Sequence, residues 1–161
     1  MVGQQKRKLL FRIRMMMVFF MVAVVISGVT AFDVEGGLRF VLQYENVLPV
    51  QLAQFLRKTY NGVHAVNSTY PMIAYGFDWL AFAHIVIAGI FIGPYRNPVK
   101  NQWVIEWAMF ACIAVLPLAL VFGPLRSIPF FWQMIDCSFG VFGILPLYIT
   151  NRWINQLKGK R

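Results

Sequence analysis

Four long apolar runs constrain this chain of 161 residues more than any other feature of its sequence. Each run is close to the roughly 17 to 25 residues that an α-helix needs to cross the hydrocarbon core of a bilayer. Only 13% of all residues are charged, whereas about 25% are charged in a soluble domain. The sequence therefore predicts four transmembrane helices and argues against a secreted disulfide scaffold, a disordered chain or a typical soluble enzyme. The runs comprise residues 15–32, 71–93, 103–122 and 130–149.

The first apolar run has two interpretations. Basic residues precede it, and Val29, Thr30 and Ala31 end it in the pattern of a cleavable signal peptide. The run is longer than the usual apolar region of such peptides, so we predict a retained helix and keep cleavage of residues 1–31 as the alternative. Under both interpretations residues 33–70 form a loop on the outer side of the membrane.

Basic residues predict the orientation, because short cytoplasmic loops of membrane proteins retain Lys and Arg. With the amino terminus inside, 4 of the 15 Lys and Arg residues lie on the outer side and the remainder on the inner side. We therefore predict a bacterial inner-membrane protein with both termini in the cytoplasm and basic tails at residues 1–14 and 150–161. The net charge of +9 then reflects this asymmetry and contact with anionic lipid, and no nucleic-acid partner is expected. The outer basic residues are Arg39, Arg57, Lys58 and Arg126, and the inner ones are Lys6, Arg7, Lys8, Arg12, Arg14, Arg96, Lys100, Arg152, Lys158, Lys160 and Arg161.

The outer loop contains one amphipathic pattern. Residues 48–58 carry apolar side chains at helical spacing, and Pro49 is suited to the first turn of a helix. We predict a short helix that lies on the membrane surface or caps the bundle. Gly36, Gly37 and Gly62 are expected to mark flexible segments on either side of it.

Glycine followed by proline marks the predicted ends of the second and third membrane helices, at Gly93 and Gly123. The stretches 78–96 and 106–126 share a pattern of acid, tryptophan, phenylalanine, alanine and isoleucine before these ends. An inverted repeat, as in several transporter folds, would produce this likeness. The sequence leaves open whether the likeness is such a repeat or a result of biased composition.

Small residues predict how the helices pack. Ala74, Ala81 and Ala88 recur every seven residues on one face of the second helix, and each of the other three helices also has a face with small residues. Such faces allow membrane helices to approach closely. The expected fold is an all-α integral membrane protein, in which an antiparallel bundle of four transmembrane helices forms one membrane domain over residues 1–161.

Ionisable residues near the helix ends are the main candidates for a site, because charge in a membrane is costly and usually paired. Asp78 and Asp136 lie near the predicted outer ends of two helices, and Arg126 lies in the outer turn. We predict a polar cluster of these residues, which either staples the helix ends together or binds an anion or a lipid headgroup. At the inner face, we expect Glu106 to form ion pairs with Arg96 and Lys100.

His84 is the one histidine within a predicted span, about 9 Å deeper than Asp78 at 1.5 Å per residue. Its candidate roles are a hydrogen bond inside the bundle, a proton relay, a metal ligand or an axial ligand to haem. Haem would need a second ligand, such as His64 from the outer loop, and the sequence has no motif for covalent attachment. We therefore predict no cofactor and no metal site, and no disulfide between Cys112 and Cys137, because they lie at different predicted depths.

Two classes of function remain. The small size, the packing faces and the lack of a recognisable catalytic motif favour a non-catalytic accessory or assembly subunit of a larger membrane complex. The alternative is a redox or transport component that uses His84 and the cluster of Asp78, Asp136 and Arg126 to bind a cofactor, a proton or a small ligand. The sequence does not decide whether the protein is an enzyme, although it favours a non-enzymatic role. Expected partners are the lipid bilayer and either other membrane subunits or further copies of this chain.

Overall fold

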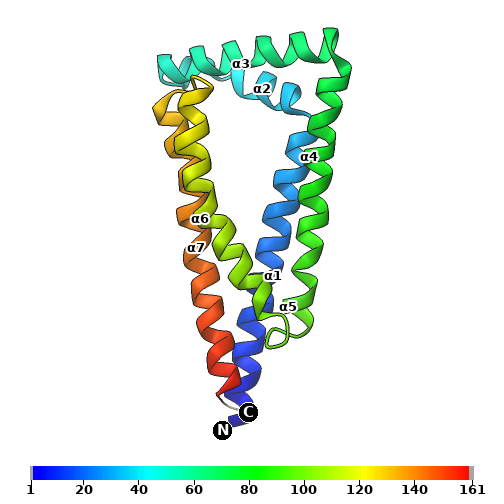
Figure 1. The fold of residues 1–161 in the computed structure, drawn as a ribbon, viewed down its shortest axis with the longest axis vertical. Coiled ribbons are helices and arrows are strands. Elements are labelled where there is room, and N and C mark those ends of the chain that lie inside the picture. The colour runs from blue at the N-terminus through cyan, green and yellow to red at the C-terminus, as the bar shows by residue number, and fades with distance from the viewer. Residues whose placement is uncertain (1, 160–161) are drawn as a thin grey trace. The chain divides into compact units, whose positions relative to one another are not determined.

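All secondary structure is helical in residues 2–159, the part of the chain that the computed structural model describes (Figure 1). Four apolar segments are long enough to cross a membrane, and they coincide with the four predicted runs. They are formed by α1 (Val2–Phe32), α4 (Pro71–Ile90) together with α5 (Ile92–Arg96), α6 (Gln102–Leu125) and α7 (Phe130–Lys158). Between the first two of these segments lie α2 (Val34–Leu42), the 3-10 helix η1 (Glu45–Val47) and α3 (Val50–Thr69).

The helices pack as two compact units. One comprises residues 21–89, and the other comprises residues 1–20 and 90–161. Both boundaries fall within or at the end of long helices, so α1 and α4 contribute residues to both units. Two of the basic residues assigned to the inner side, Lys160 and Arg161, lie outside the described residues.

A hairpin of α6 and α7 is the main feature of the second unit, and Figure 1 shows the two helices side by side. At one end, Gly123 is so close to Gln133 that a Cβ on the glycine would lie 2.7 Å from Cγ of Gln133. Further along, Gly140 packs directly on the backbone carbonyl of Cys112. At the other end, Gln102 of α6 donates a hydrogen bond to Asn151 of α7. Earlier residues of α6 thus meet later residues of α7, as two antiparallel helices require.

The first half of α1 belongs to the same unit and contributes to its core. Leu9, Ile13 and Met17 are buried at a spacing of four residues, which places them on one face of the helix. Phe20 stacks on Phe91 with 5.8 Å between ring centroids. Two of these buried residues lie within residues 1–14, so the stretch expected to be a basic tail is helical and packed. The carboxy-terminal stretch is likewise helical up to Lys158.

In the unit of residues 21–89, α1 approaches α4 closely at Gly28. A Cβ at this glycine would lie 2.8 Å from the carbonyl oxygen of Ala81 and 3.0 Å from Cβ of His84. Ala81 and Ala88 are both buried. The small-residue face predicted for the second membrane helix is thus a packing face over these two positions, while Ala74 is half-buried.

The segment of residues 33–70, predicted to be an outer loop, contains more helix than predicted. The predicted helix at residues 48–58 corresponds to α3, which continues to Thr69, and α2 lies beside it. Gly36 and Gly37 lie inside α2, and Gly62 lies inside α3, so the expectation of flexible segments at these glycines is wrong. Asp33 explains why α2 begins where it does, because its side chain accepts a hydrogen bond from the Gly36 amide at 2.7 Å and so caps the helix.

The predicted end at Gly93 falls inside α5, which follows the end of α4 at Ile90, and the predicted end at Gly123 is slightly too early. Pro94 is in the first turn of the short helix α5, where the missing amide hydrogen costs no helical hydrogen bond. α6 continues past Gly123 to Leu125, and Arg126 is its C-cap residue. Ser127, which follows the C-cap, has φ of 56°. The Ile128 amide donates to the Gly123 carbonyl and the Ser127 amide to the Pro124 carbonyl, which together form a Schellman cap.

Candidate functional site

His84 lies in α4 where that helix meets α1. Its Nδ1 is 2.8 Å from the carbonyl oxygen of Leu80, one turn earlier in the same helix. A carbonyl oxygen only accepts hydrogen bonds, so Nδ1 carries the proton in this contact. A neutral imidazole in this tautomer leaves the lone pair of Nε2 available to a ligand or a further donor.

Asp78 lies one and a half turns before His84 and is half-buried. It borders a cavity of about 80 Å³, whose lining also includes the polar side chains of Asp33, Glu35 and Asn67. Within residues 2–159 the Asp78 carboxyl has no hydrogen bond or ion pair to another side chain. The structure thus places Asp78 beside polar groups at the start of α2 and in α3, which the sequence analysis did not connect with it.

A polar cluster between α2 and α3 was missed by the sequence analysis. The Glu35 carboxylate accepts hydrogen bonds from Asn67 and from Nδ1 of His64, both at 2.7 Å, and a third from Arg39 at 3.3 Å. The Glu35 side chain is 14% exposed. The hydrogen bond from Asn67, followed by that from His64, holds the pKa of Glu35 below its ordinary value. His64 is therefore a partner of Glu35 in this structure, a role the sequence analysis did not consider.

Two local signals could have pointed to this Glu35 cluster. His64 and Asn67 are three residues apart, so they lie on the same face of a helix. Asp33 and Glu35 follow directly after an apolar run, as a capped helix start does. Neither signal reveals that the two faces meet, because Glu35 is 29 residues from His64 and 32 residues from Asn67.

The other members of the predicted outer cluster belong to the second unit. Arg126 is the C-cap residue of α6 and is exposed, while Asp136 is half-buried in the second turn of α7. Among residues 2–159 no ion pair joins Arg126 to Asp136, and Asp78 belongs to the unit of residues 21–89. The cluster of all three residues stays a prediction.

The predicted inner ion pairs are also not formed in the described part of the chain. Arg96 ends α5, and Lys100 lies in the turn before α6, where its amide bonds to the Asn97 side chain at 3.1 Å. Glu106 is exposed on α6 and has no ion pair with either basic residue among residues 2–159. These three side chains remain candidates for pairing.

A cluster of amides between α6 and α7, formed by the buried Gln102, the half-buried Asn151 and the exposed Asn155, was not predicted. Nε2 of Gln102 donates to Oδ1 of Asn151 at 2.7 Å and to Oδ1 of Asn155 at 3.0 Å. Gln102 is 7% exposed, so these bonds form with little competition from solvent. The cluster links α6 to α7 and has no titratable group, which indicates a structural role.

Cys112 and Cys137 are both free thiols, and Cys112 packs beside Gly143. Within the described residues, no group of three or more histidine, cysteine, aspartate or glutamate side chains is arranged to hold a metal ion. No protein family, curated protein or solved structure matches this chain.

Proposed function

We propose that the chain is an integral membrane protein whose four long helices cross the bilayer as an antiparallel bundle. The observation that supports this most is the exposure of the apolar helices, since at most 22% of the apolar stretch of any of them is buried within the chain. Such extensive apolar surface is not stable in water. The distribution of Lys and Arg supports a bacterial inner membrane with both termini in the cytoplasm.

Within the membrane, we propose a non-catalytic role as an accessory or assembly subunit of a larger complex. Several polar side chains support this, because they make contacts within the chain: Gln102 links two helices, and His84 bonds to Leu80 at a helix crossing. Large apolar side chains point outward instead, including Phe139 and Phe142 of α7, which are 69% and 72% exposed. Partner helices or lipid must cover these faces.

Extraction of the native protein in a mild detergent, followed by identification of the chains that elute with it, tests this role. Elution with a reproducible set of other membrane chains supports the proposal. Phe139→Ala with Phe142→Ala should release those chains if α7 contacts them, while the control Phe110→Ala on α6 should not. Elution as a protein without partners, with both variants behaving like the wild type, would contradict an accessory role.

A second candidate function is a redox or transport component, and one observation favours it. Histidines that bind metals usually donate their other ring N–H to a carbonyl or carboxylate, and His84 does so to Leu80. Asp78 next to a polar cavity, with Asp136 and Arg126, would be the further candidates for proton or ligand binding. A visible haem spectrum that is lost in His84→Ala and kept in His64→Ala would establish this candidate and displace the accessory role.

A further inference from the structure

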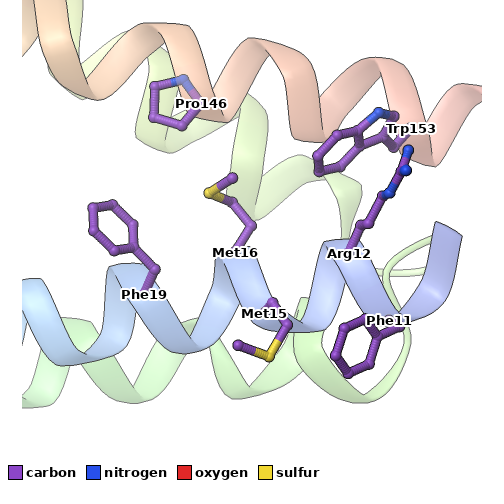
Figure 2. Close-up of a pocket in the computed structure, with 7 residues that line it drawn as sticks. All are labelled: Phe11, Arg12, Met15, Met16, Phe19, Pro146 and Trp153. Carbon is purple, nitrogen blue, oxygen red and sulfur yellow. The ribbon is translucent and has the colours of Figure 1, made fainter. Parts of the chain in front are cut away.

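An open groove lies between the first half of α1 and the end of α7, within the unit of residues 1–20 and 90–161 (Figure 2). Its volume is about 520 Å³, and its lining is almost entirely apolar. Figure 2 shows Met16 and Phe19 reaching from α1 toward α7, where Pro146 and Trp153 form the opposite side. Methionine side chains adapt readily to irregular apolar partners, so this groove suits a flexible hydrocarbon chain.

Arg12 lies at one end of the groove. Its guanidinium carbon is 5.9 Å from the centre of the Trp153 ring, a cation–π contact that holds the charge beside the apolar lining. Within residues 2–159 the guanidinium has no hydrogen bond or ion pair. Its N–H donors are therefore free to bind an anion, and their fork geometry fits phosphate oxygens.

A second, basic groove adjoins the apolar one. It has a volume of about 480 Å³, is lined by Arg7 and Lys8, and shares Phe11 and Arg12 with the first groove. Lining residues along α1 thus change from basic at residues 7–8 to apolar at residues 15–19. At 1.5 Å per residue, the whole stretch from residue 7 to residue 19 is about 18 Å long, so one amphipathic molecule can contact both parts.

We propose that these two grooves form one binding site for an anionic phospholipid, with its phosphate at Arg12 and an acyl chain along Met16 and Phe19. The charge of the basic part selects a negative headgroup, and the apolar part selects a long hydrocarbon chain. A lipid without net charge does not match the basic part, and a soluble phosphate without a hydrocarbon chain does not match the apolar part. The site is independent of the accessory role, because either functional candidate can bind lipid here.

Native mass spectrometry of the full chain in detergent, titrated with dioleoyl phosphatidylglycerol, tests the proposal. Dioleoyl phosphatidylcholine serves as the neutral probe and glycerol phosphate as the headgroup without a tail. Arg12→Gln should weaken phosphatidylglycerol binding about fivefold, as expected for one basic residue near a lipid headgroup. It should weaken phosphatidylcholine binding less, because the choline cation offsets the charge of that lipid's phosphate. Arg12→Lys keeps the charge and should retain most of the affinity.

Arg14→Gln is the matched control. Arg14 is on the same helix, but its guanidinium already lies over Tyr95 and its Nε donates to the Tyr95 carbonyl at 3.3 Å. This variant should bind phosphatidylglycerol like the wild type. Equal losses in Arg12→Gln and Arg14→Gln, equal affinity for the two lipids, or displacement by glycerol phosphate at lipid concentrations would each overturn the proposal. A dimer that excludes the lipid would assign the groove to a second copy of the chain and overturn it as well.

Discussion

At the scale of single residues, Glu35 shows how far sequence reasoning reaches. Its position after Asp33 and before Arg39 is readable as the start of a helix with an ion pair one turn later. Its bonds to His64 and Asn67 are not readable, because they depend on how α2 and α3 pack. His84 shows the same limit, since its bond to Leu80 is local while its contact with Gly28 requires the helix crossing.

The Glu35 carboxylate should make the stability of the folded protein depend on pH. Its pKa is lowered in the folded protein, chiefly by Asn67 and then by His64, so the stabilisation is complete above about pH 4.5 and is lost as the pH falls further. Glu35→Gln should therefore lower the unfolding midpoint at pH 7, and its difference from the wild type should shrink below pH 4.5. Thermal unfolding in detergent at several pH values measures this. Glu106→Gln, which removes a carboxylate that has no ion pair among residues 2–159, is the control, and a difference for Glu35→Gln that does not vary with pH would contradict the prediction.

Ser127 is the second residue with a specific consequence. Its φ of 56° lies in the left-handed region, which costs a residue with a Cβ about 1 kcal/mol or more relative to glycine. Ser127→Gly should raise the free energy of unfolding by about 1 kcal/mol, because glycine is the preferred residue at this position of a Schellman cap. Unfolding in mixed detergent micelles measures the change. Ser127→Ala keeps the Cβ, so a gain as large as that of glycine would show that the backbone conformation is not the cause.

At the scale of helices, close approaches at glycine should control the stability of each pair. Gly28→Ala would place a Cβ 2.8 Å from the Ala81 carbonyl, so it should destabilise the protein by about 1–3 kcal/mol. Gly76→Ala on α4 is the matched control, because nothing lies within 4 Å of its added Cβ. The control should be neutral or slightly stabilising. Equal unfolding midpoints for the two variants would mean that α1 and α4 do not pack at Gly28.

The existence of the four long helices was predictable, and their ends were not. Length and apolar composition are sufficient to predict that the helices exist, because an apolar segment in a bilayer must satisfy its own backbone hydrogen bonds. The ends depend on packing and capping. Leu9 and Ile13 are buried on one face of α1, which keeps the basic stretch helical, although apolar residues at this spacing were visible in the sequence. The extension of α3 to Thr69 follows from contacts with α2 that only the fold provides.

At the scale of the whole molecule, the buried face of α1 bears on the signal-peptide alternative. Ile13 and Met17 are fully buried in the unit that also contains the buried Ile105 and Ile154. A signal peptide is removed after translocation and does not serve as the core of the mature protein. The packing of α1 therefore supports the proposal of a retained helix, and in the proposed bundle of four spans the carboxy terminus would lie on the same side as the amino terminus.

This arrangement predicts which residues are accessible from outside an intact bacterial cell. In a background of Cys112→Ala and Cys137→Ala, Lys58→Cys on α3 should react with a membrane-impermeant maleimide, because it lies in the predicted outer segment and is exposed. Lys158→Cys at the end of α7 is also exposed, yet it should react only after the cells are broken. Lys6→Cys should behave like Lys158→Cys, because both termini are predicted to lie on the inner side. Labelling of only one terminus in intact cells would rule out four spans. Labelling of both termini, with no labelling of Lys58→Cys, would show that the orientation is the opposite of the one that the basic residues predict.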